Sequence, residues 1–204
     1  MTLPDSFYQR SDVVQIAREL LGKVIITEKA GITTSAMITE TEAYAGVTDK
    51  ASHAWRGRRT QRTEVMYAAG GVAYVYLCYG IHHLFNVVTY KEDIPHAILI
   101  RAASPLEGTD IMLERRRHER LTPSLTAGPG SMSMALGIHT NDSGIWLQGP
   151  EIRLEDRRII IPEHEIVATP RIGVAYAGED AYLPYRFYVK GNPYVSKGKY
   201  LQQP

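Results

Sequence analysis

The sequence predicts one domain of the α+β class, with a mainly antiparallel sheet and a few flanking helices over residues 1–204. Three observations support this. Several runs alternate apolar and polar residues and are separated by short turns, as in hairpins. Helical periodicity is confined to a few short segments. A chain of 204 residues with 44% hydrophobic content suits one globular core, and we find no repeat, low-complexity tract or linker.

The first elements are a helix and a hairpin. After an irregular lead-in over residues 1–10, Ser11 is a plausible N-cap and Gly22 a plausible C′ stop for a packing helix. A strand at 23–26 and a turn at 29–31 follow. The returning strand is expected to extend through residues 38–44.

The returning strand has an unusual face. A period of two places four residues together: Ile38, Glu40, Glu42 and Tyr44. An acid group can therefore lie beside an aromatic surface, where partial loss of hydration makes it usable as a general base. Spacing alone does not choose between Glu40 and Glu42, and each alone is most often a surface or salt-bridge residue.

A second hairpin follows a long loop over residues 45–62, which has no periodicity. The next strand, 72–79, places Tyr74 and Tyr76 on one face, and the Tyr79-Gly80 step predicts a tight turn with Tyr79 at its tip. The strand then resumes with Asn86 among apolar neighbours, where a buried amide needs hydrogen-bond partners. Together these groups predict a pocket for a flat ligand with polar edges.

The second half of the chain predicts shorter elements. A strand at 96–101 ends in Arg101, which either reaches a polar pocket or forms a salt bridge at its rim. A helix is expected to end near Arg117, and a second one is expected over 131–136 after the loop 128–130, whose N–H groups could meet a phosphate. The remainder, 145–189, predicts short strands with turns at 149–150 and 178–180.

Composition excludes several classes of protein. One cysteine, Cys78, cannot form an internal disulfide or hold an iron–sulfur cluster alone, and its place in a strand favours a buried position. The first residues show no cationic start followed by an apolar run, and no apolar stretch reaches membrane-spanning length, so we expect an intracellular protein without a membrane partner. The net charge is only +1, but basic clusters at 56–62, 115–117 and 190–199 modestly favour a surface that faces phosphates.

A series of motifs resembles the alkyladenine (3-methyladenine) DNA glycosylase family. The motifs occur in the expected order and span nearly the whole chain: 40–44, His53, 74–80, Asn86, 99–102, 105–108, 127–129, 135–138, 171–174 and 186–189. The resemblance implies a single domain with a mixed, mainly antiparallel curved sheet and flanking helices, related to the C-terminal domain of methionyl-tRNA formyltransferase. In the Gly-Pro loop the chain has Ser131 near a position that is often basic in the family.

The resemblance also implies an activity and roles. The expected reaction is hydrolysis of the N-glycosidic bond of an alkylated or deaminated purine flipped out of double-stranded DNA. Glu42 resembles the general base and Arg101 its positioning partner. The base pocket would consist of Tyr44, Ala51, His53, Tyr76 and Asn86, and Tyr79 would fill the gap left in the duplex. The substrate class is 3-methyladenine, 7-methylguanine, hypoxanthine and ethenoadenine. The enzyme would be a monomer in the cytoplasm or nucleoid of a bacterium, or in a eukaryotic nucleus.

Water is the expected nucleophile, and no cofactor or metal is expected. A lyase reaction would need an amine, and no lysine lies within 40–44, within 74–86 or beside Arg101. Two alternatives stay open. One is a metal-dependent hydrolase that uses Glu40, Glu42 and the histidines His53, His82 and His83, although close ligand spacing is absent. The other is a non-catalytic nucleic-acid-binding module of the formyltransferase C-terminal type.

Overall fold

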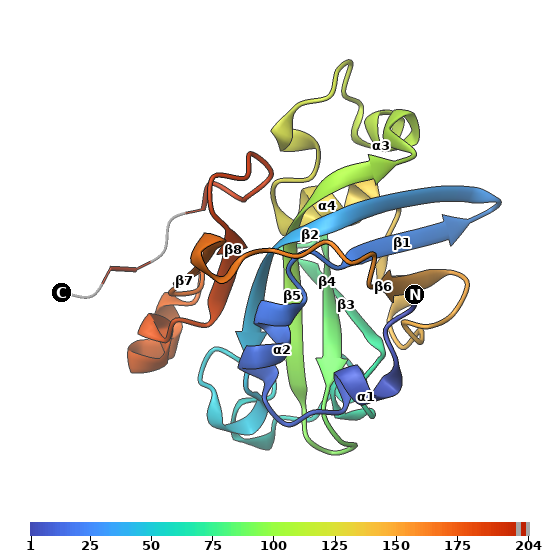
Figure 1. Cartoon of the computed structure of the whole chain (residues 1–204). Helices are drawn as coiled ribbons and strands as arrows, with labels where there is room; N and C mark the ends of the chain where they lie inside the picture. The colour runs from blue at the N-terminus through green and yellow to red at the C-terminus, as the bar shows by residue number, and fades with distance from the viewer. Residues whose placement is uncertain (199–200, 203–204) are drawn as a thin grey trace.

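An eight-stranded antiparallel sheet organises the molecule, as a computed structural model that describes residues 1–198 and 201–202 shows (Figure 1). The central order is β3-β4-β5-β2-β1-β6, and β8 joins β2 and carries β7. The strands are β1 Val24–Lys29, β2 Ile32–Tyr44, β3 Ala73–Cys78, β4 His82–Thr89, β5 His96–Glu107, β6 Ile152–Glu155, β7 Ile166–Thr169 and β8 Arg186–Val189. The α+β prediction is confirmed, and every ladder in the described part is antiparallel.

The helices are short and flank the sheet. They are α1 Asp5–Tyr8, α2 Val13–Glu19, α3 Thr109–Arg116 and α4 Pro129–Ala135, with 3-10 turns η1 Gly46–Thr48, η2 Trp55–Gly57, η3 Glu64–Tyr67, η4 Pro123–Leu125, η5 Thr140–Asp142, η6 Glu163–Glu165 and η7 Ala175–Tyr182. None of the described helices is long and apolar enough to cross a membrane.

Three local expectations need correction. The N-cap of α2 is Asp12 and not Ser11, because the Asp12 carboxylate accepts a hydrogen bond from the Gln15 N–H. Helix α4 begins at Pro129, since proline suits the first helical turn. Residues 178–180 form part of η7 and not a turn between strands.

Strand β2 is the longest strand and links two parts of the sheet. Its first half forms a hairpin with β1 through Ala30 (φ 51°) and Gly31 (φ 76°), which confirms the turn predicted there. Its second half runs between β5 and β8. The Thr41 hydroxyl donates to the Ala17 carbonyl of α2, so the alternate residues of β2 face away from that helix.

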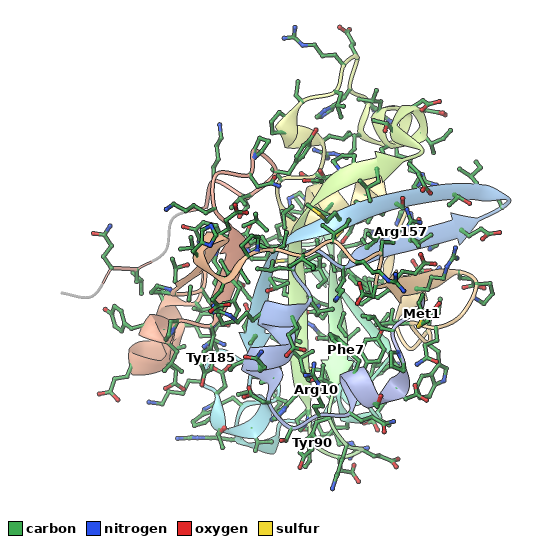
Figure 2. The ribbon with its side chains drawn as sticks, in the orientation of Figure 1. Met1, Phe7, Arg10, Tyr90, Arg157 and Tyr185 are labelled. Carbon is green, nitrogen blue, oxygen red and sulfur yellow. The ribbon has the colours of Figure 1, made fainter. Side chains whose placement is uncertain are left out.

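Helices α2 and α4 pack against the sheet and share one hydrophobic core with it. Helix α2 lies in front of β2 and β5 in Figure 1, and α4 lies behind β4 and β5. Side chains surround the ribbon on all sides in Figure 2, where Arg10 lies near α1. The Arg10 guanidinium carbon is 4.8 Å from the centre of the Phe7 ring. This packing leaves part of the face opposite α2 uncovered.

The β3–β4 hairpin ends in the expected tight turn. Tyr79 (φ 51°) and Gly80 (φ 74°) form its corner, and the Ile81 N–H donates to the Cys78 carbonyl. The Tyr79 side chain is 92% exposed. At the base of the turn, the His82 ring packs so closely on Gly130 that a Cβ there would lie 2.9 Å from it. The hairpin is therefore fixed to the start of α4.

Candidate active site

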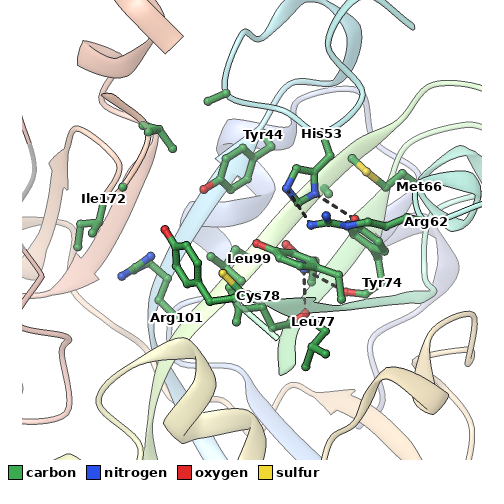
Figure 3. Close-up of a pocket in the computed structure, with 18 of the residues that line it drawn as sticks. Tyr44, His53, Arg62, Met66, Tyr74, Leu77, Cys78, Leu99, Arg101 and Ile172 are labelled. Atoms are coloured by element: carbon green, nitrogen blue, oxygen red, sulfur yellow. Dashed lines mark hydrogen bonds between the residues drawn. The ribbon is translucent and has the colours of Figure 1, made fainter. Parts of the chain in front are cut away.

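A cavity of about 450 Å³ opens on the sheet face opposite α2 (Figure 3). Strand register sets three residues of its floor, Tyr74, Asn86 and Leu99, which are successive partners across β3, β4 and β5, and the next partner on β2 is Glu42. Seven of the eight predicted site residues line this cavity: Tyr44, Ala51, His53, Tyr76, Tyr79, Asn86 and Arg101. Glu42 does not line it and lies immediately behind.

Glu42 is fully buried but hydrogen-bonded to residues of the cavity wall. Its Oε2 accepts from the Tyr44 hydroxyl at 2.8 Å and lies 3.3 Å from Nη1 of Arg101. Its Oε1 accepts from the Ile172 N–H at 2.8 Å. A carboxylate oxygen has two lone pairs, so among these contacts Oε1 keeps one for a further donor such as water.

Glu40 has different surroundings, although it shares the strand face. Its Oε1 accepts from Arg101 Nε, Arg186 Nε and the Ser196 hydroxyl, and its Oε2 accepts from the Ser196 N–H at 2.6 Å. Of these partners only Arg101 lines the cavity. The structure thus separates two acids that spacing leaves equivalent: Glu40 is a structural ion pair, and Glu42 adjoins the cavity.

The groups around Glu42 hold defined protonation states. Burial, and then the nearby Glu42 charge, raises the pKa of the Tyr44 phenol well above its ordinary value, so the hydroxyl remains a donor. Burial alone would lower the pKa of Arg101, but the Glu42 and Glu40 carboxylates outweigh it and raise that pKa. Arg101 therefore stays cationic and bridges both acids.

Aromatic rings form the opposite wall. His53 meets Tyr76 edge-on with ring centres 4.7 Å apart, and His53 Nδ1 lies 3.0 Å from the Tyr74 hydroxyl. Burial, followed by the charges of Arg62 and Arg58, lowers the pKa of His53 to about 4. His53 is therefore neutral at physiological pH.

Asn86 is buried and satisfied, as predicted. Its Nδ2 donates to the carbonyls of Tyr74 at 3.0 Å and Leu84 at 3.2 Å. Both bonds use the amide nitrogen, so in the described contacts the amide oxygen is the group left for a ligand.

A buried ion pair that the sequence analysis did not single out holds the loop carrying Ala51 and His53. Arg171 Nη1 and Nη2 contact the two carboxylate oxygens of Asp49 at 2.5 and 2.9 Å. Asp49 also accepts from the Ala45 and Ala51 N–H groups. Only the family resemblance of motif 171–174 pointed to Arg171, because Asp49 and Arg171 are far apart in the chain.

Two other cavity residues were also missed. Tyr176 of η7 is 70% exposed, lines the cavity and donates its hydroxyl to the Ala51 carbonyl at 3.1 Å. Arg62, from the loop between η2 and η3, lies against Tyr76 and His53. Cys78 is only partly buried and lines the cavity, so the expectation of a buried position is wrong.

The basic clusters are not all free for phosphates. In the cluster 115–117, Arg115 donates to the Ala135 carbonyl, and Arg116 donates to the Ser124 carbonyl and the Ser131 hydroxyl. These two arginines join α3 to the α4 region, although Arg116 does bring a guanidinium to Ser131. Lys199 of the third cluster lies outside the described residues.

The ligands of a metal-dependent hydrolase do not come together. Within residues 1–198 and 201–202, no group of three or more His, Cys, Asp or Glu is placed to hold a metal ion. His82 packs on Gly130, and His83 Nδ1 accepts from the Thr140 N–H. That alternative therefore has no supporting geometry.

Comparison with known proteins identifies the family. The model of the methylpurine-DNA glycosylase (MPG) family matches residues 6–193. A chain of Chlamydia felis named "Putative 3-methyladenine DNA glycosylase" is 47% identical over 186 residues, covering 91% of this chain and 94% of the relative. A chain of Bacillus cereus with the same name is 43% identical over 205 residues, covering 97% and 100%. The chain therefore belongs to the methylpurine-DNA glycosylase family of DNA-repair enzymes.

Proposed function

We propose that this chain is a monofunctional glycosylase that removes alkylated or deaminated purines from double-stranded DNA by hydrolysis. The observation that carries the proposal is the buried Glu42 carboxylate, joined through Tyr44 and Arg101 to an aromatic cavity. Its volume of about 450 Å³ falls in the usual range for small-molecule pockets. The names of the relatives support 3-methyladenine as one substrate.

The pocket would hold the flipped base between aromatic surfaces. Tyr44 forms one wall, and His53 with Tyr76 forms the other, while the backbone near Ala51 meets the edge of the base. Flipping costs a few kcal/mol and is least costly for weakened pairs. Asn86 on the floor would obstruct the exocyclic amino group of normal guanine.

The exposed Tyr79 would fill the space that the base leaves in the duplex. Its 92% exposure supports this role, because an aromatic side chain gains nothing from such a position within the fold.

The chemistry would use water held by Glu42. The carboxylate accepts a proton from water, the oxygen bonds to C1′, and the bond between C1′ and the base nitrogen breaks with its electron pair leaving on the base. Arg101 stays cationic and would orient Glu42 near the sugar-phosphate. The described lining of the cavity contains no lysine, which supports a water nucleophile and no lyase step.

The test is base release from duplexes that each contain one lesion, with wild type, Glu42→Gln and the control Glu28→Gln. The control makes the same chemical change, carboxylate to amide, at Glu28, whose side chain is 49% exposed. We expect Glu42→Gln to lose about 10²–10⁴-fold in single-turnover rate, the usual contribution of a general base, while still binding an abasic analogue. The Glu28→Gln rate should equal that of wild type.

Two results would reject the proposal. A Glu42→Gln rate equal to wild type would remove Glu42 from the chemistry. Wild-type protein that binds DNA but releases no lesion base would favour the non-catalytic binding module. Base release from the same lesions in single strands, compared with the duplexes, would test the proposed double-strand substrate. Measuring the molecular mass of the protein in solution would test the proposed monomeric state.

A further inference from the structure

Arg62 places a positive charge against one wall of the pocket. Its guanidinium carbon lies 4.8 Å from the centre of the Tyr76 ring, and its Nη2 lies 3.4 Å from His53 Nε2. Figure 3 shows the guanidinium pointing toward His53. The side chain is exposed, so it stands at the mouth of the cavity. Both of its ring contacts belong to the wall that the proposed function assigns to the flipped base.

The charge of Arg62 is not neutralised by a carboxylate. In the part of the chain that the structure describes, no ion pair joins Arg62 to an acid. Arg59, three residues earlier, is different: it pairs with Glu64 at 2.7 Å and with Asp93 at 2.6 Å. A base that enters the pocket therefore meets the uncompensated field of Arg62.

The contact with Arg62 also fixes the form of His53. An arginine only donates hydrogen bonds, so His53 Nε2 is the acceptor and Nδ1 carries the proton that faces the Tyr74 hydroxyl. The ring is then neutral, and Arg62 supplies the only positive charge at this wall among the residues that contact Tyr76.

We propose that Arg62 is a specificity-determining residue, which biases the pocket toward uncharged damaged purines and against purines that carry a positive charge. The inference rests on the proposed function. A purine nucleoside methylated on N3 or N7 is cationic, whereas hypoxanthine and ethenoadenine are neutral. A cationic base would lie near a like charge and would compete with Arg62 for the π-face of Tyr76. A neutral base meets no repulsion from the charge of Arg62.

The test compares 7-methylguanine with hypoxanthine in one duplex sequence, using wild type, Arg62→Gln and Arg59→Gln. Both substitutions remove one positive charge from the same loop, but only Arg62 touches the wall. We expect Arg62→Gln to raise the ratio of single-turnover rates, cationic over neutral base, by about two- to fivefold, which corresponds to the free energy of an exposed cation–π contact. Arg59→Gln should leave the ratio unchanged, and added salt should reduce the difference.

The outcomes separate this inference from the proposed function. If Arg62→Gln slows release of both bases equally, Arg62 is a phosphate contact, and the inference is wrong. An unchanged ratio would overturn it as well, although wild-type base release would still support the proposed function. If wild type releases neither base, the proposed function fails and the inference fails with it.

A readout without DNA checks the position of Arg62. The Arg62 charge lowers the pKa of His53, so an NMR titration of the His53 ring should give a higher pKa in Arg62→Gln than in wild type. Arg59→Gln should titrate like wild type. Equal His53 titration in all three proteins would mean that Arg62 does not stay at the wall, which would overturn the inference.

Discussion

Asp49→Asn is expected to destabilise the protein by about 3–5 kcal/mol, the usual cost of breaking one side of a buried ion pair. The side chains of Arg171 and Asp49 are 0% and 2% exposed, and two N–H···O contacts join them. Asparagine keeps the shape of the side chain but removes the charge. It also leaves only one acceptor oxygen, so part of the Arg171 guanidinium becomes an unpaired buried donor.

This loss is large compared with the stability of a domain, which is about 5–15 kcal/mol. At about 2–4 °C per kcal/mol for a chain of this size, the melting temperature should fall by roughly 6–20 °C. The assay is urea unfolding at pH 7, and the control is Asp93→Asn. Asp93 is 69% exposed and pairs with Arg59, so that change should cost less than about 1 kcal/mol. Equal unfolding free energies for the two variants would refute the reasoning.

Four further predictions concern the hairpin, the histidine and the rival mechanism. Tyr79→Ala should change the unfolding free energy by no more than about 0.5 kcal/mol, because the side chain is exposed, yet it should slow base release; an unaffected rate would contradict this. Gly130→Ala should cost about 1–3 kcal/mol by crowding His82, and adding His82→Ala, which removes the two ring contacts and keeps the Cβ contact, should recover part of that loss in urea unfolding. The pKa of His53 falls from 6.5 to about 4 on folding, so the unfolded chain binds the proton first as the pH falls. Urea midpoints should therefore drop between pH 6.5 and pH 4, and the drop should be smaller in His53→Gln. Base release should be unchanged by a chelator, and a loss that Zn²⁺ or Mg²⁺ restores would revive the metal-dependent alternative.

Local patterns were sufficient for the hairpins and for the exposed tip. Strand alternation placed Glu40 and Glu42 on one face, and the Tyr79-Gly80 step predicted a corner that the backbone angles confirm. Both features depend on a few neighbouring residues, so spacing contains the information. Cap positions were less certain, because Ser11 and Asp12 are both good N-caps and only the geometry chooses Asp12.

The site itself needed information that spacing does not contain. Strand register decides that Asn86 and Leu99 lie between Tyr74 and Glu42, and register is set by pairings between distant segments. The separation of Glu40 from Glu42 likewise depends on Ser196, far along the chain. The resemblance favoured Glu42 over Glu40 for a reason not visible in the local sequence; the structure places Glu42 beside the cavity, and its catalytic role stays a prediction.

The bonds between Glu40 and Ser196 have a consequence for the order in which the protein matures. Ser196 follows β2, β5 and β8 in the chain, so until it has been synthesised Glu40 lacks the backbone and hydroxyl donors of Ser196 that complete its network with Arg101 and Arg186. We therefore expect base release to begin only after β8 and the following segment that carries Ser196 have been synthesised. Proteolytic removal of Ser196 and the residues after it should abolish base release, while most of the sheet stays folded.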